Sequence, residues 1–175
     1  MTAGYSITLA RPGDVQALPA IELAAARLLE GHAPESVLNQ ATDLAALRAA
    51  QAAGRLWVAL AYGVPVGFAI VEMLADGLPH LEEIDVHPSH GRRGLGTLLV
   101  RAVCEWAGRS GFAGITLTTN RDVRWNMPFY SRMGFTEIPA GRIRAALAEV
   151  VDEETARGLD PAARVAMVHR CKTKP

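Results

Sequence analysis

Residues 81–96 read LEEIDVHPSHGRRGLG, and this stretch decides how the rest of the chain is interpreted. The run 81–86 is typical of a short strand, and Pro88 ends it because proline lacks the N–H that a strand donates. Three glycines within six residues follow, with Arg92 and Arg93 between them. A helix is predicted directly afterwards, since apolar side chains recur at helical spacing on one face: Leu95, Leu98, Leu99, Ala102, Val103 and Trp106.

The order of strand, Gly/Arg loop and helix predicts an anion site. The first turn of a helix has backbone N–H groups without partners, and the helix dipole places partial positive charge there. Glycines let a phosphate approach the backbone and two arginines add charge, so the loop is interpreted as a pyrophosphate cradle. The loop alone is equally compatible with a tight turn and a solvated arginine pair.

Two nucleotide-binding fingerprints fail in detail. The Walker pattern needs a lysine after its last glycine, and none follows here. The dinucleotide pattern G-x-G-x-x-G begins well at Gly94 and Gly96, but Leu99 occupies the position of the third glycine.

Composition limits the classes of protein to consider. The chain has 175 residues, half of them hydrophobic, which predicts one domain over residues 1–175. Eighteen basic side chains balance eighteen acidic ones, so we expect no nucleic-acid or membrane partner. Cys104 and Cys171 form no metal or redox spacing and fit free thiols. No secretory signal and no apolar run of ~20 residues is visible, so we expect a cytoplasmic protein.

Periodicity and turn residues predict a mixed sheet with helices on both sides. Tyr62-Gly63 between two apolar runs predicts a hairpin, which argues against a wholly parallel sheet. Asp14 is expected to cap the first helix, and the acidic run 152–154 is interpreted as a solvated helix face. Strands are predicted at 5–10, 55–61, 64–74, 81–86, 113–119, 135–138 and 164–170, and helices at 15–29, 34–53 with an interruption, 94 to about 108–111, 127–133 and 145–157.

Two groups of residues recur at a fixed spacing: Val86, Pro88, Gly94 and Gly96, followed by Asn126, Tyr130, Gly134 and Phe135. Together they resemble the GNAT superfamily of N-acetyltransferases, best over residues 80–138. The chain departs from the family pattern V-x-P-x-x-[RQ]-x-x-G-x-[GA] at Gly91, where Arg or Gln is usual. The resemblance implies an α/β (α+β) fold: a mixed, mostly antiparallel central sheet of about six or seven strands, splayed in the middle, with helices on both faces.

The resemblance implies acetyl-CoA as co-substrate and no metal. The pantetheine arm would pair with the backbone of Ile84, Asp85 and Val86, which would splay from the strand at 115–119. An N–H near Ile84 would polarise the acetyl carbonyl. Asn126 would hydrogen-bond the arm, or cap the helix that follows. The pyrophosphate would sit on the amides of Gly91, Arg92, Arg93, Gly94, Leu95, Gly96 and Thr97.

Amine attack on a thioester needs a base, because an alkyl ammonium has a pKa near 10.4. The family's base usually falls at positions matching 80 or 82, so Glu82 is the first candidate, His80 the second and Glu83 the third. Each is equally compatible with an ordinary charge on a strand surface. Strict alternation predicts two faces: His80, Glu82 and Ile84 on one, and Leu81, Glu83 and Asp85 on the other.

Tyr130 matches the family tyrosine that protonates the leaving thiolate, although a tyrosine packed at a helix end would look the same. A covalent route through Cys104 has no visible base and is not expected. The expected function is therefore direct acetyl transfer from acetyl-CoA to a primary amine in a ternary complex. The alternatives are transfer from another acyl-CoA, or a non-catalytic acyl-CoA-binding or sensing module.

The acceptor is expected to be an amine of a small molecule or peptide. Its pocket is predicted to involve residues 15–53, the 62–63 hairpin and the loop 121–126, segments in which fold does not determine substrate. Three acids near these segments would favour a cationic amine: Glu72, Asp76 and Asp122. The resemblance also makes a homodimer possible.

Overall fold

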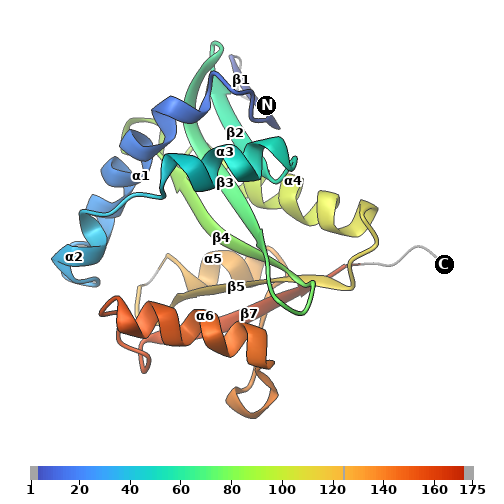
Figure 1. Cartoon of the computed structure of the whole chain (residues 1–175). Coiled ribbons are helices and arrows are strands. Elements are labelled where there is room, and N and C mark those ends of the chain that lie inside the picture. The colour runs from blue at the N-terminus through green and yellow to red at the C-terminus, as the bar shows by residue number, and fades with distance from the viewer. Residues whose placement is uncertain (1–3, 124, 172–175) are drawn as a thin grey trace.

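The computed structural model describes residues 4–123 and 125–171, and within them seven strands form one sheet (Figure 1). The strand order is β1-β2-β3-β4-β5-β7-β6, and every neighbouring pair is antiparallel except β4 and β5. This order confirms the predicted mixed, mostly antiparallel sheet. The strands are β1 (Tyr5–Leu9), β2 (Leu56–Ala61), β3 (Val64–Met73), β4 (Pro79–Val86), β5 (Gly114–Asn120), β6 (Thr136–Glu137) and β7 (Arg164–Arg170).

Helices cover both faces of the sheet, as predicted (Figure 1). On one face α1 and α3 pack on the β2–β3 hairpin, and α6 packs farther along on Ala166 of β7. On the opposite face α4 and α5 share a second apolar cluster with Val165 and Met167. The helices are α1 (Leu18–Ala26), α2 (Glu35–Leu38), α3 (Leu44–Ala52), α4 (Leu95–Arg109), α5 (Met127–Arg132) and α6 (Ala145–Ala156).

The first helical region differs from the prediction. The helix expected at 15–29 is α1 flanked by single 3-10 turns. The interruption expected within 34–53 is confirmed, because it separates α2 from α3. The expected cap by Asp14 is wrong, because its carboxylate instead accepts a hydrogen bond from the Arg11 N–H at 2.8 Å and closes the preceding turn. Asp43 caps α3 by accepting from the N–H of Ala45 at 2.8 Å.

Strands β4 and β5 pair at only two positions, His80 with Thr116 and Leu81 with Leu117. Beyond Leu81, strand β4 keeps its antiparallel partner β3 but has lost β5. The predicted splay is therefore confirmed, and it leaves one backbone edge of β4 without a strand partner over residues 82–86.

A β-bulge at Glu82 changes which way the β4 side chains point. Strand β3 residues Ile70 and Val71 are consecutive, yet they pair with Glu83 and Leu81, so Glu82 is the extra residue. A bulge shifts the alternation by one position. The two faces predicted by strict alternation are consequently wrong. The face toward α1 carries His80, Glu83 and Asp85, whereas Leu81, Ile84 and Val86 join the cluster under α4.

The longest described helix, α4, has 15 residues. None of the helices in the described ranges combines the length and apolarity needed to cross a bilayer.

Candidate active site

A groove of about 910 Å³ opens where β4 and β5 separate. Its walls come from α1, the segment 33–43, β4, the Gly/Arg loop, α5 and α6. One end is formed by the loop and the first turn of α4, and the other end is rich in carboxylates. The groove therefore joins the predicted cofactor site to a region that could receive an acceptor.

In the Gly/Arg loop, glycines leave the backbone at the start of α4 accessible to a ligand. Gly94 precedes the helix with φ +78°, a left-handed conformation that glycine adopts without strain. An added Cβ at Gly91, the position where the family usually has Arg or Gln, would lie 3.2 Å from the Pro88 carbonyl oxygen. A side chain there would need the backbone to shift by a few tenths of an ångström.

The two arginines of the loop have different surroundings. Arg92 lines the groove and holds a left-handed φ of +55°, which is unusual for a residue with a side chain. Arg93 instead places its guanidinium carbon 5.8 Å from the ring centre of Tyr5. Of the predicted cradle residues, the groove is lined by all except Arg93: Gly91, Arg92, Gly94, Leu95, Gly96 and Thr97.

The predicted pantetheine-pairing residues Ile84, Asp85 and Val86 also line the groove. The Ile84 N–H donates to Oε1 of the neighbouring Glu83 at 3.2 Å. Because β5 has separated from β4 here, no strand competes for this N–H. It is available to a ligand that displaces the Glu83 oxygen.

Three carboxyl groups converge on the α1 side of β4. The ligand oxygens of Glu22, Glu83 and Asp85 all lie within 4.8 Å of one another. Glu22 is fixed by Thr42, whose N–H donates to Oε2 at 2.9 Å and whose hydroxyl donates to Oε1 at 3.1 Å. We call these three residues the carboxyl trio. Carboxylate oxygens at this spacing can accept hydrogen bonds from an ammonium group or ligate a hard cation.

Burial raises the pKa of every member of the carboxyl trio. Burial, and after it the charge of Glu22, raises the pKa of Glu83 to about 7. Burial, and after it the charge of Glu83, raises the pKa of Asp85 well above the aspartate value. Burial also raises the pKa of Glu22, against the hydrogen bonds from Thr42. The carboxyl groups of the trio therefore hold their protons to higher pH than isolated carboxyl groups do.

The other two predicted bases have different environments. Glu82 lines the groove from the bulge with an exposed side chain, and desolvation within the groove, followed by the charge of Glu72, raises its pKa. His80 is only 2% exposed, and its Nδ1 lies 2.9 Å from Oγ1 of Thr116. Burial lowers the pKa of His80 to about 4, so the imidazole is neutral and a weak base at neutral pH.

Tyr130 faces the groove from α5 and packs edge-on against Phe129 and Phe135, with ring centres 5.0 and 5.8 Å away. Burial, followed by the charges of Glu83 and Asp85, raises the pKa of Tyr130, so the phenol keeps its proton at neutral pH. Such a group can donate a proton but does not act as a base.

Asn126 lines the groove directly before α5, but its side chain makes no capping hydrogen bond. Asn126 is therefore the N-cap residue of α5 by position, but it lacks the side-chain hydrogen bond expected of a cap.

The far wall includes residues that the sequence did not point to. Glu153 and Glu154 of α6 line the groove. Asp152 and Glu153 are exposed, as expected of a solvated face, whereas Glu154 is partly buried, so the interpretation of the acidic run as a solvated face is wrong for Glu154 alone. Glu154 accepts from Arg164 Nε at 3.0 Å, and Arg164 Nη2 donates to Thr118 at 3.0 Å. Glu22 was also missed. Its signal was a lone acid on the buried side of an apolar helix.

The predicted acceptor residues are only partly brought together. Glu72 lines the groove. Asp76 instead pairs with Arg144 at 3.1 Å, and Asp122 is not among the lining residues. The hairpin at 62–63 is also outside the groove, and Tyr62 is 84% exposed.

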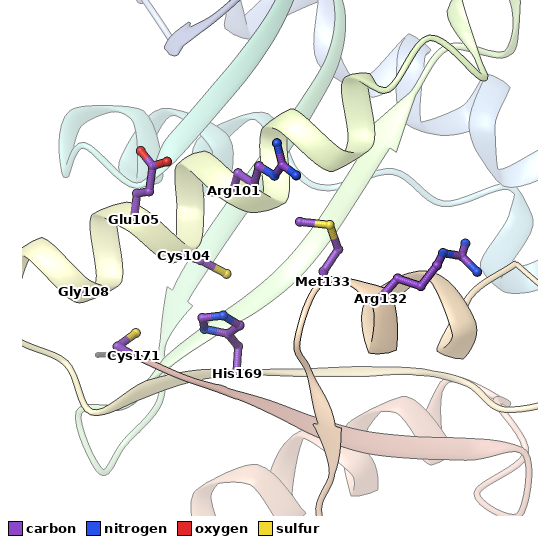
Figure 2. Close-up of a pocket in the computed structure, with 8 residues that line it drawn as sticks. All are labelled: Arg101, Cys104, Glu105, Gly108, Arg132, Met133, His169 and Cys171. Atoms are coloured by element: carbon purple, nitrogen blue, oxygen red, sulfur yellow. The ribbon is translucent and has the colours of Figure 1, made fainter. Parts of the chain in front are cut away.

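Both cysteines line a separate cavity of about 320 Å³ between α4 and the end of β7. Figure 2 shows Cys104, Cys171 and His169 gathered around this space. Burial, and after it Cys171, raises the pKa of Cys104 to about 12, which keeps the thiol protonated. None of the carboxyl trio lines this cavity. A thiol nucleophile needs a lowered pKa, and the pKa of Cys104 is raised, so this environment does not support one although His169 lies nearby.

Known proteins resemble this chain in sequence and fold. The model of the Acetyltransferase (GNAT) family matches residues 22–135. A mycothiol acetyltransferase of Nocardiopsis dassonvillei is 42% identical over 88 residues, and the match covers 50% of this chain but only 26% of that protein. This chain thus spans about a quarter of that relative.

Two solved structures share the fold. The PaiA N-acetyltransferase of Thermoplasma acidophilum, in complex with coenzyme A, has a TM-score of 0.72 at 14% identity and covers 95% of this chain and 98% of its own. The ribosomal-protein-S18-alanine N-acetyltransferase of Escherichia coli has a TM-score of 0.67 at 17% identity, over 98% and 96% of the two chains.

Proposed function

Because this chain belongs to the GNAT acetyltransferase family, we propose that it transfers an acetyl group from acetyl-CoA to a primary amine of a small molecule or peptide. The observation that carries the proposal is the splay beyond Leu81, which opens an unpaired strand edge beside the Gly/Arg loop. This arrangement provides backbone N–H groups both for an anion and for an extended ligand.

The residues present fit acetyl-CoA. The first turn of α4 and the Arg92 guanidinium would hold the pyrophosphate, because both present positive charge to one end of the groove. The open edge of β4 would pair with the pantetheine arm. When bound, acetyl-CoA supplies an activated acyl group. The Ile84 N–H would then stabilise the charge that develops on the carbonyl oxygen. The PaiA structure with coenzyme A supports binding of an acyl-CoA by this fold.

Proton transfer is assigned to Glu83 and Tyr130. A base is most effective when its pKa lies near the working pH, and the pKa of Glu83 is about 7. Glu83 would accept the proton of the attacking ammonium, with Glu22 and Asp85 beside it. Tyr130 would donate its phenolic proton to the leaving thiolate. The exposed Glu82 and the neutral His80 are less suited to the base role, although both line the groove.

Transfer is proposed to be direct. The acid and base candidates share one groove, whereas Cys104 opens into the other cavity and holds a protonated thiol. Amine and acetyl-CoA would therefore be bound together before reaction.

Isothermal titration with acetyl-CoA, compared with CoA, ATP and NAD, tests the cofactor assignment. We expect micromolar binding of acetyl-CoA and no binding of ATP or NAD. A Gly96→Glu variant should bind acetyl-CoA at least about tenfold more weakly than Gly96→Gln, because only the carboxylate repels the pyrophosphate. The Cβ that both variants add would make an ordinary contact at 3.7 Å from Phe129, and Glu and Gln have the same size, so steric effects cancel in the comparison.

An amine panel with detection of the released thiol tests turnover. Release of CoA that depends on the amine supports the enzyme. Tight binding of acetyl-CoA without turnover on any amine would instead identify an acyl-CoA-sensing module. A clear preference for a longer acyl-CoA would replace acetyl with another acyl group.

A further inference from the structure

The carboxyl trio contains a buried acceptor atom that nothing satisfies. Among the described residues, Oδ2 of Asp85 is buried and has no hydrogen-bond partner. Buried carboxylate oxygens are normally paired, so an orphaned one indicates a missing donor. Its carboxyl group lies within 4.8 Å of Glu22 and Glu83, which places the missing donor among three acids.

Among the described residues, no cation forms an ion pair with Glu22, Glu83 or Asp85. Two arginines of the groove wall act on the trio only through their charge: Arg157 on Glu22, and Arg164, which is hydrogen-bonded to Glu154, on Glu83. A ligand that brings both positive charge and N–H donors would satisfy the trio.

More unpaired acids continue along the same groove. Glu72, Glu82 and Glu153 line it, and their carboxylates make no hydrogen bond or ion pair with the other described residues. Glu72 lies opposite His80 in the β3–β4 register, and Glu82 is the bulge residue of β4, the strand that carries Glu83 and Asp85. A single ammonium group in the trio would leave these three outer acids to the charge of Arg157, which acts on Glu82 from the groove wall.

The wall of the groove is apolar on the side of α1 and α2. Its side chains can pack against methylene groups but cannot pair with a polar ligand. They are Ala25, Leu28, Leu29, Ala33 and Val37.

We propose that the acceptor is an aliphatic diamine or polyamine. One ammonium group binds the carboxyl trio, a second meets the outer acids Glu72, Glu82 and Glu153, and the methylene chain lies along the apolar wall. This inference rests on the proposed function and names the acceptor class. An acceptor with a carboxylate near its amine is disfavoured, since it would face like charges.

Calorimetric binding to the whole chain in the presence of CoA tests the acceptor class directly. The probes are pentylamine, the pentane α,ω-diamine and the pentanoic ω-amino acid, which share one chain length. We expect the diamine to bind at least about tenfold more tightly than pentylamine, and the amino acid more weakly than both. Equal binding of diamine and monoamine would overturn the proposal.

A Glu22→Gln variant tests the trio. The amide keeps the size of the side chain and removes its charge, so diamine affinity should fall at least about tenfold while CoA affinity stays the same. Glu105→Gln is the matched control, because Glu105 is exposed in the other cavity, and it should change neither affinity. Unchanged diamine binding in Glu22→Gln, or tighter binding of Mg²⁺ than of diamine at the trio, would contradict the proposal.

Binding and turnover separate the two proposals. If no amine releases CoA, the proposed enzyme fails, and the diamine affinities still decide the acceptor site. If amines react but diamine and monoamine do so equally well, the enzyme stands and the diamine site is wrong.

Discussion

The hydroxyl of Tyr5 lies 2.9 Å from Nδ1 of His90, so the first strand of the chain is hydrogen-bonded to the Gly/Arg loop 85 residues later. The same ring lies beneath the guanidinium of Arg93. Strand β1 is at the edge of the sheet, yet through this one side chain it contacts two residues of the loop. Tyr5 is therefore a positioning residue for the candidate pyrophosphate site.

Replacing Tyr5 with Phe should weaken acetyl-CoA binding. The ring and its contact with Arg93 remain, but the bond to His90 is lost, and a bond of this kind contributes about 1 kcal/mol. We expect KM for acetyl-CoA to rise about fivefold with kcat nearly unchanged. Steady-state kinetics measures both. Tyr62→Phe is the control, since Tyr62 is exposed on the hairpin. A fall in kcat at constant KM would rule out a positioning role.

Replacing Arg92 with Ala should reduce acetyl-CoA affinity more than replacing Arg93. Arg92 lines the groove, whereas Arg93 lies over Tyr5. Titrations at low and high salt should show about a tenfold loss for Arg92→Ala that shrinks as salt rises, because the contact is electrostatic. A larger loss for Arg93→Ala would reverse the two roles.

Replacing Tyr130 with Phe should lower kcat by about a hundredfold or more, the usual contribution of a general acid. The ring packing on Phe129 and Phe135 is preserved, so acetyl-CoA affinity should stay within about twofold. Calorimetry and thiol release measure the two quantities. A variant with wild-type kcat would remove Tyr130 from the mechanism.

The rate should depend on pH through Glu83. A base must be unprotonated to act, so kcat should fall as pH drops through about 7, the pKa of Glu83. In Glu83→Gln this acidic limb of the pH profile, the fall in kcat below about pH 7, should vanish along with most of the activity. Glu82→Gln is the comparison. If Glu82→Gln loses the limb and Glu83→Gln keeps it, the base is Glu82.

Glu83 should also make the fold less stable at high pH. Its folded pKa is raised from 4.5 to about 7, so its stabilising effect is complete below 4.5 and is lost as pH rises through 7. The corresponding loss is on the order of 3 kcal/mol in the free energy of unfolding. Glu83→Gln should therefore be more stable than the wild type at pH 8 in urea denaturation. A less stable variant would mean that the carboxylate is compensated in the folded state.

The sequence predicted the sheet well because its signals are local. Alternation and turn residues marked each strand within a few residues, and the glycines around Arg92 and Arg93 marked the start of α4. The same locality explains the errors. The residues of 81–86 carry no local signal for an extra residue at Glu82, because a bulge depends on the pairing with the partner strand.

Contacts that form only through tertiary packing could not be predicted from the sequence either. Glu22 and Glu154 lie far from β4 in sequence and reach the groove because α1 and α6 pack on the same face of the sheet. The contact between Tyr5 and His90 likewise depends on β1 lying at the sheet edge next to β2.

The bulge at Glu82 means that the face on which a β4 side chain lies cannot be counted from its position in the chain: Glu83 directly follows Glu82, yet it lies on the same face as His80. Deleting residue 82 would leave a regular ladder in which Glu83 and Asp85 still face α1, because Leu81 and Glu83 already pair with consecutive residues of β3. The carboxyl trio should therefore survive both this deletion and Glu82→Ala. Diamine binding to the two variants would measure this, and a loss in the deletion variant alone would show that the bulge itself positions the trio.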